Sequence, residues 1–282
     1  MIRYKYLDFT NFFLTKSIIN KNNLNTVCQE ANCPNITECW SKRHATFMIM
    51  GDTCTRACAF CDVKTGVPGK LDQLEPVKIA EAVKKLNLKH VVITSVDRDD
   101  LKDGGSNHFF EVINQTRKTN PNTTIEVLTP DLWGGGKNLD ETNNLQTERL
   151  KMILEKDPIC FNHNLETVER LQKEVRRGAN YKKSLSLLKK SKDIAPHIQT
   201  KSGIMLGLGE TLDEIKNTIY DLKKIDCDQI TIGQYLRPSF NHLAVKKYWD
   251  PSEFEYLYRF SKELGFKKVS SGPLVRSSYH AG

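Results

Sequence analysis

The chain has 282 residues, of which 39% are hydrophobic and 27% charged, a composition typical of a globular protein long enough for one large α/β barrel or two domains. No apolar run approaches the roughly 18 residues of a membrane-spanning helix, and residues 1–20 resemble neither a secretory signal nor a transit peptide. The net charge of +8 is scattered over helical patterns and matches no nucleic-acid-binding signature. We therefore expect a cytoplasmic protein that binds neither nucleic acid nor a membrane, with a basic surface that is solvated or attracts an acidic partner.

Short apolar runs alternate with helical patterns from residue 45 onward. The runs are rich in β-branched residues and cover 45–50, 90–95, 124–129, 159–163, 201–206 and 228–233. The helical patterns cover 76–87, 107–119, 147–156, 166–176, 181–193 and 211–225. Thr211 and Glu214 form a capping-box pattern at the start of the last of these. The alternation predicts an α/β fold with a parallel sheet, a (β/α)₆ partial TIM barrel, with a doubly wound open sheet as the alternative.

Two flanking segments lie outside this alternation. Residues 1–44 hold three cysteines and little periodicity, and residues 265–282 contain one short strand-like piece followed by Gly272-Pro273. We therefore divide the chain into an N-terminal cysteine-rich extension (1–44), a barrel (45–264) and a C-terminal tail (265–282). Residues 133–146, which contain three consecutive glycines and several asparagines, are predicted to be an exposed loop insertion.

Six of the eight cysteines lie between residues 28 and 61, a clustering that favours metal ligands over disulfides. The set Cys54-x₃-Cys58-x₂-Cys61 directly follows the first predicted strand, where α/β barrels keep their active sites. Three thiolates on one loop can hold three irons of a [4Fe–4S] cube and leave the fourth iron open. The alternative, a zinc knuckle, lacks a fourth ligand after Cys61, and only His44 is near.

A second set, Cys28-x₄-Cys33-x₅-Cys39, suits neither a zinc ribbon nor a two-cluster ferredoxin. Together, the two sets indicate two iron–sulfur clusters, although some of these thiols could instead have a redox or structural role. The isolated Cys160 and Cys227 are predicted to be buried apolar residues, and His163 and His280 to be structural.

Several motifs of the sequence resemble those of a known family. The loop Cys54–Cys61, with Phe60 before its last cysteine, is similar to the radical S-adenosylmethionine (SAM) signature. The stretch Val27–Asn35 and the closing Arg276-Ser277-Ser278-Tyr279 resemble the auxiliary-cluster motifs of the lipoyl synthase family. Further stretches agree over nearly the whole chain, from about Thr26 to Ala281: Ile93–Asp100, Phe161–Thr167 and Thr231–Leu236. The segment before Thr26 and the 133–146 insertion depart from the family pattern.

The resemblance implies an enzyme that inserts sulfur at C6 and C8 of a protein-bound octanoyl-lysine. The cluster on Cys54, Cys58 and Cys61 would cleave SAM to a 5′-deoxyadenosyl radical. The second cluster, held by Cys28, Cys33, Cys39 and a serine, would donate the sulfur. Motif position favours Ser278 over Ser277, and a hard oxygen ligand among soft thiolates suits a cluster that is dismantled.

The resemblance also implies contacts and partners. SAM would lie near Phe60, Gly104 and Gly105, and near Asn164 and Glu166 after the fourth strand. The competing interpretations are a plain turn at the glycines, and a helix cap by Asn164 with Glu166 in the first helical turn. The implied partners are octanoylated lipoyl carrier domains or a glycine cleavage H-type protein, and an electron donor such as flavodoxin or ferredoxin.

Other functions weighed against this one are a biotin-synthase-like or methylthiotransferase-like sulfur inserter, an iron–sulfur electron carrier and a zinc-binding structural protein. Biotin-type enzymes take auxiliary ligands from barrel strands, whereas here the ligands precede the barrel. An electron carrier would use cysteine at every ligand position and needs no barrel of this size. These differences favour the lipoyl synthase interpretation.

Overall fold

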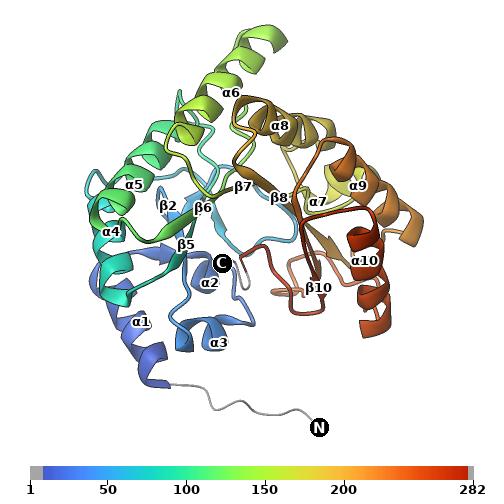
Figure 1. The fold of residues 1–282 in the computed structure, drawn as a ribbon, viewed down its shortest axis with the longest axis horizontal. Helices are drawn as coiled ribbons and strands as arrows, with labels where there is room; N and C mark the ends of the chain where they lie inside the picture. The colour runs from blue at the N-terminus through green and yellow to red at the C-terminus, as the bar shows by residue number, and fades with distance from the viewer. Residues whose placement is uncertain (1–8, 279–282) are drawn as a thin grey trace.

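The computed structural model describes residues 9–278 and is built on an eight-stranded sheet (Figure 1). Its strands are β1 (Asn25–Thr26), β2 (Thr46–Ile49), β5 (His90–Ser95), β6 (Thr124–Leu128), β7 (Cys160–Asn162), β8 (Gln199–Leu206), β9 (Gln229–Gln234) and β10 (Lys268–Gly272). A small second sheet pairs β3 (Thr53–Cys54) with β4 (Lys64–Thr65). The main sheet runs in the order β1-β2-β5-β6-β7-β8-β9-β10, and every pair from β2 onward is parallel.

The described helices are arranged about this curved sheet, most of them on its outside, as Figure 1 shows. They are α1 (Phe9–Lys21), α2 (Val27–Glu30), α3 (Ile36–Ser41), α4 (Glu75–Leu86), α5 (Ser106–Thr119), α6 (Leu139–Leu154), the 3₁₀ helix η1 (Glu169–Leu171), α7 (Gln172–Val175), α8 (Tyr181–Ile194), α9 (Leu212–Lys224) and α10 (Pro251–Glu263). In the part of the chain that the structure describes, no helix is long and apolar enough to cross a membrane.

The sheet confirms the partial barrel. Because strand order follows chain order without reversing, the doubly wound alternative is wrong. The six predicted strands correspond to β2, β5, β6, β7, β8 and β9. Their buried residues, among them Phe47, Ile93 and Phe161, pack with the apolar faces of the surrounding helices. The predicted capping box is present at the start of α9, where the Thr211 hydroxyl accepts from the Glu214 N–H and the Glu214 carboxylate from the Thr211 N–H.

Two sequence predictions are wrong in detail. Residues 133–146 are not one loop, because α6 begins at Leu139 with Asn138 as its N-cap. Asn143 and Asn144 lie on the exposed face of that helix, while Thr142 and Gln146 face inward. The predicted helix over 166–176 is replaced by an irregular segment that ends in η1 and α7.

Both flanking segments join the main sheet. From the N-terminal extension, β1 pairs antiparallel with β2, and from the tail, β10 pairs parallel with β9. Beyond β10 the chain turns toward the middle of the ring (Figure 1). The Asn35 side chain donates to the Leu274 carbonyl at 2.7 Å, and the Gln234 N–H donates to the Pro273 carbonyl at 3.3 Å. The tail therefore packs against residues from both ends of the open sheet.

Candidate active site

A cavity of about 480 Å³ opens at the carboxyl ends of the barrel strands. Its wall contains residues of both cysteine sets, the ends of β5, β8 and β9, and residues 275–278 of the tail. Segments that are far apart in the sequence thus share one enclosed space. This arrangement is typical of an active site.

The first cysteine set borders this cavity, as predicted. Cys54 ends β3, and Cys58 and Cys61 follow on the loop, each half-buried. The backbone N–H groups of Arg56 and Asp97 point at the Cys54 sulfur, at 3.4 and 3.3 Å. Such N–H groups stabilise a thiolate or a cluster-bound sulfur.

Burial raises the pKa of every thiol in this set. The pKa of Cys58 rises to about 12, although the charge of Arg176 partly counteracts the rise, and that of Cys61 rises to about 11. Burial likewise raises the pKa of Cys54, and repulsion from the nearby Cys54 adds to the pKa of Cys61. The free thiols are therefore protonated at neutral pH, and metal binding must release their protons.

The second cysteine set lies beside the same cavity. Cys28 is on α2, Cys33 is in the following turn and Cys39 is on α3. All three, together with Ser278, line a small adjoining hollow. Burial raises the pKa of Cys28 to about 11 and that of Cys39 to about 12. Ser278 lines the main cavity as well, whereas Ser277 lines the main cavity but not the hollow, and its hydroxyl lies close to Gly203.

Within residues 9–278, no three His, Cys, Asp or Glu side chains are arranged as ligands of one ion. A [4Fe–4S] cube differs from a zinc site in that each thiolate binds its own iron.

The predicted SAM contacts separate into two groups. Phe60, Asn164 and Glu166 line the cavity. The Asn164 amide donates to the Glu166 carboxylate at 2.8 Å, and Glu166 has a left-handed backbone with φ of 65°. Because the first helix after them begins only at Glu169, the helix-cap interpretation of Asn164 is wrong.

The glycine pair lies apart from these three residues. Gly104 and Gly105 are not among the described residues that line the cavity. Both have positive φ values, 58° and 83°, and they form the turn before α5, beside Arg149 and Met50. Their positive φ values allow this turn, as the plain-turn interpretation expects, and their contact with SAM stays a prediction.

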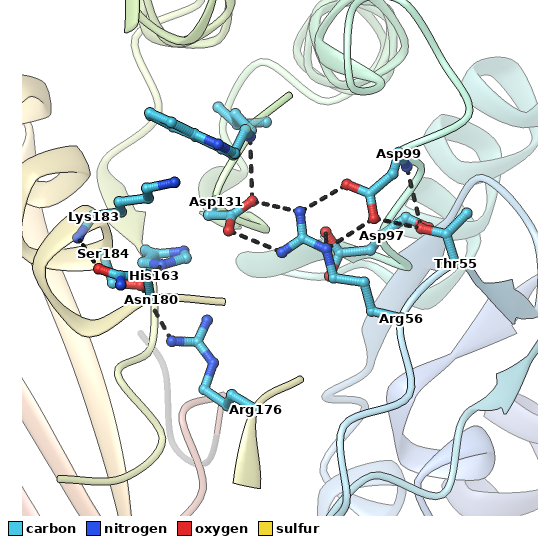
Figure 2. Close-up of polar contacts among 12 residues, drawn as sticks. Thr55, Arg56, Asp97, Asp99, Asp131, His163, Arg176, Asn180, Lys183 and Ser184 are labelled. Carbon is cyan, nitrogen blue, oxygen red and sulfur yellow. Dashed lines mark hydrogen bonds and ion pairs between the residues drawn. The ribbon is translucent and has the colours of Figure 1, made fainter. Parts of the chain in front are cut away.

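Several polar groups of the cavity wall were missed from the sequence. Thr94, Ser95 and Asp97 lie at the end of β5. Arg176 is buried and donates to the Ser184 hydroxyl at 3.2 Å (Figure 2). The family resemblance includes residues 93–100 but implies no role for their side chains. Arg176 was missed because it lies in an irregular segment, which has no periodic pattern in the sequence.

Of the residues predicted to be structural, His163, Cys160 and Cys227 are buried. His163 is fully enclosed between the Thr129 carbonyl and the Ser184 hydroxyl, each at 2.9 Å, and burial lowers its pKa to about 4. His280 lies outside the described residues.

Replacing Gly203 by alanine should weaken SAM binding about tenfold. A Cβ there would lie 2.7 Å from the hydroxyl oxygens of Ser277 and Thr231 and 2.9 Å from the Asn164 amide oxygen, so the cavity wall would be overpacked. Isothermal titration of the cluster-loaded protein with SAM would measure the effect. Gly69→Ala is the matched control because a Cβ at that site meets nothing within 4 Å. Equal affinities in the two variants would contradict this placement of SAM.

Comparisons with known proteins agree with this geometry. The family model for the radical SAM superfamily matches residues 48–222. The chain is 63% identical over 281 residues to "Lipoyl synthase 2" of Prochlorococcus marinus subsp. pastoris, covering 100% of this chain and 94% of that protein. It is 53% identical over 266 residues to "Lipoyl synthase 2" of Nostoc sp., covering 94% and 88%.

Among solved structures, the FeFe-hydrogenase maturase HydG from Carboxydothermus hydrogenoformans superposes with a TM-score of 0.57 at 14% identity, covering 95% of this chain and 73% of that one. SuiB of Streptococcus suis bound to SAM superposes with a TM-score of 0.58 at 12% identity, covering 88% and 59%. At such low identity these two similarities show the fold alone.

The cofactors of this superfamily, a [4Fe–4S] cluster and SAM, fit the residues of the cavity. Three thiols surround one end, and three buried wall atoms lack hydrogen-bond partners, namely Ser95 Oγ, Thr129 Oγ1 and Asn164 Oδ1. Buried polar atoms of this kind require a polar ligand or water. The family model, the identity over the whole chain and this fit agree: the chain belongs to the lipoyl synthase family of the radical SAM superfamily, and it uses a [4Fe–4S] cluster and SAM.

Proposed function

We propose that this enzyme inserts two sulfur atoms, at C6 and C8, into a protein-bound octanoyl-lysine, with a second [4Fe–4S] cluster as the sulfur donor. The observation that carries the proposal is the shared cavity, onto which Cys28 and Cys33 open together with Cys54, Cys58 and Cys61. A substrate in that space would meet the radical source on one side and the sulfur source on the other.

The two cysteine sets have different tasks in this proposal. Cys54, Cys58 and Cys61 would hold the catalytic cluster and leave one iron free for SAM. When bound, that cluster and SAM supply the radical that removes hydrogen from an unactivated carbon. Cys28, Cys33 and Cys39 would hold the donor cluster with Ser278, whose place in the same hollow supports it over Ser277.

The protein's own contribution is to bind and enclose the substrate. The cavity wall also carries apolar side chains, namely Val27, Met48, Phe60, Leu236 and Val275. Apolar side chains of this kind would hold an octanoyl chain by the hydrophobic effect and would exclude water from a reactive radical. Asn164 and Glu166, joined by a hydrogen bond, would accept hydrogen bonds from the ribose of SAM.

The proposal includes two partner proteins, a carrier of the octanoyl group and an electron donor. The substrate would be the octanoylated lipoyl domain of an enzyme complex or an H-type carrier protein, and the net charge of +8 would favour an acidic carrier surface. A small electron-transfer protein such as flavodoxin or ferredoxin would supply the electrons for SAM cleavage. We further propose that the reaction takes place in the cytoplasm.

Anaerobic iron and sulfide content, with an absorption spectrum, is the first test. The wild type should hold about eight irons, and a variant with Cys54, Cys58 and Cys61 all changed to alanine should hold about four, since each [4Fe–4S] cluster accounts for half. The wild type should then convert an octanoyl-lysine carrier peptide, with SAM and a reductant, to a product that carries two added sulfur atoms by mass spectrometry. The triple variant should give none.

Other outcomes would overturn the proposal. A colourless protein with stoichiometric zinc would return the chain to the structural-metal class. Two clusters with SAM cleavage, but no sulfur in the octanoyl peptide, would indicate a different radical SAM substrate.

A further inference from the structure

We infer that Arg56 is a positioning residue that holds the Cys54–Cys61 loop in the shape that receives the catalytic cluster. Arg56 lies within the cysteine motif, two residues from Cys54 and two from Cys58. Its guanidinium group joins the loop to the segments that follow β5 and β6. This inference rests on the assignment of the three cysteines as cluster ligands, and not on the identity of the octanoyl substrate.

The guanidinium group is bidentate toward two carboxylates at once, as Figure 2 shows. Its Nε and Nη2 donate to Asp99 at 2.8 and 2.7 Å, and its Nη1 and Nη2 donate to Asp131 at 2.8 and 2.9 Å. A carboxylate oxygen of Asp97 lies 3.5 Å from Nε. Paired charge-assisted bonds of this kind are both strong and directional.

This group of one arginine and three carboxylates, here called the clamp, is shielded from solvent on most sides. It consists of Arg56, Asp97, Asp99 and Asp131. The Arg56 side chain is 10% exposed and that of Asp131 is 2% exposed. The glycine turn at Gly178 covers the stem of the arginine, since a Cβ there would lie 3.2 Å from Arg56 Cδ. Partly buried ion pairs are screened less by salt than surface pairs, so the clamp retains its strength in the cell.

Hydrogen bonds connect the clamp residue Asp97 to the sulfur of Cys54, the first thiol of the loop. The Thr55 N–H donates to the Asp97 carbonyl at 3.1 Å. In return, the Asp97 N–H points at the Cys54 sulfur at 3.3 Å. On the far side, Asp131 is itself fixed, because its carbonyl accepts from the Gln146 amide at 2.7 Å and its carboxylate from the Trp133 N–H at 3.2 Å. The loop is therefore anchored to α6 through one arginine.

The arginine also balances charge. Three carboxylates converge on Arg56, and without a cation they would repel one another and the thiolates of the loop. Lysine would restore the charge, but one ammonium group cannot be bidentate toward two carboxylates. Arg56→Lys therefore separates the geometry of the clamp from its charge.

Cluster assembly on the whole protein tests the inference. The measurements are the rate of iron and sulfide incorporation during anaerobic reconstitution, and the electron paramagnetic resonance spectrum of the reduced protein with and without SAM. In Arg56→Lys, the SAM-responsive cluster should form about tenfold more slowly, as expected for the loss of one charge-assisted bond. The auxiliary cluster should form at the wild-type rate, because the carboxylates that bind Arg56, those of Asp97, Asp99 and Asp131, all lie outside the Cys28–Cys39 segment.

Arg170→Lys is the matched control. Arg170 is also bidentate toward a carboxylate, that of Glu214 at 2.6 and 3.0 Å, but this pair lies on the surface away from the cysteine loop. It should reconstitute like the wild type. The triple-alanine variant gives the signal of the auxiliary cluster alone. If its spectrum still responds to SAM, the ligand assignment fails, and that failure is separate from a failure of the clamp.

Two further variants keep the test decisive if Arg56→Lys folds poorly. In Arg56→Ala, added guanidinium ion should restore cluster assembly, whereas the same concentration of ammonium should not. Asp99→Asn removes the charge of the most exposed of the three carboxylates, 41% exposed, and should also slow assembly of the SAM-responsive cluster. Wild-type assembly in both Arg56→Lys and Asp99→Asn, or restoration of Arg56→Ala by ammonium as well as by guanidinium, would overturn the inference.

Discussion

Replacing Gly233 by alanine should separate SAM cleavage from sulfur insertion. A Cβ at Gly233 would overlap the carbonyl oxygen of Val275 and lie 3.3 Å from a guanidinium nitrogen of Arg276. Both belong to the tail that carries Ser278, so the tail must move. We expect sulfur insertion to fall about a hundredfold or more, because a ligand misplaced by an ångström can cause such a loss. SAM cleavage, which depends on the Cys54–Cys61 loop, should change by only a few-fold.

Gly272→Ala is the matched control for this prediction. Gly272 pairs with Gly233 across β10 and β9, but a Cβ there would meet only Val275 Cγ2, at an ordinary 3.6 Å. The measurement is the ratio of 5′-deoxyadenosine to sulfur-containing product in a single turnover of the reconstituted enzyme, because the donor cluster is consumed. An unchanged ratio in Gly233→Ala would show that the position of the tail does not matter for sulfur insertion.

Replacing Lys201 by methionine should strongly destabilise the fold. The Lys201 ammonium on β8 lies 3.0 Å from the Glu126 carboxylate on β6, and both side chains are 4% exposed. Glu126 also accepts from the Asn162 amide at 2.9 Å. Removing the lysine leaves a buried carboxylate whose remaining ionisable neighbour is His90, at 3.9 Å, and burial lowers the pKa of that imidazole. Loss of the lysine should therefore lower the free energy of unfolding by about 3–5 kcal/mol.

Thermal unfolding of the anaerobic protein, followed by circular dichroism, would measure this effect as a decrease in Tm of roughly 6–20 °C. Lys85→Met is the control, because the Lys85–Glu81 pair spans 3.6 Å on an exposed helix face and contributes less than about 1 kcal/mol. The double variant Lys201→Met with Glu126→Gln should recover part of the stability, since the unpaired charge is gone. No recovery would mean that the effect comes from packing rather than from charge.

The sequence predicts the barrel well where periodicity and burial coincide. The β-branched runs fall on six strands, because buried parallel strands leave few polar positions. It fails where local composition and tertiary burial disagree. Asn143 and Asn144 suggest a loop but lie on the exposed face of α6, and the segment around Glu166 adopts a positive φ that no periodicity announces.

The same contrast holds for the site. Cysteine spacing predicts two ligand sets, because neighbouring ligands leave a local signature. The contact between Arg56 and Asp131 joins residues 75 positions apart. It depends on how the ends of adjacent strands meet, and no single segment encodes this. Thr94 and Ser95 are missed for the same reason. The sequence does not show which polar residues at strand ends face the cavity.

The open edge of the barrel has a consequence for the order in which the protein is made. The hydrogen bond between Asn35 and the Leu274 carbonyl spans 239 residues. At about 5–20 residues per second, a ribosome takes roughly 12 to 50 s to synthesise that stretch. The Cys54–Cys61 loop can find its neighbours on β5 and β6 early in this interval. The Cys28–Cys39 segment must wait for the tail, so a nascent chain passes through a period in which three of its thiols lack their final cover.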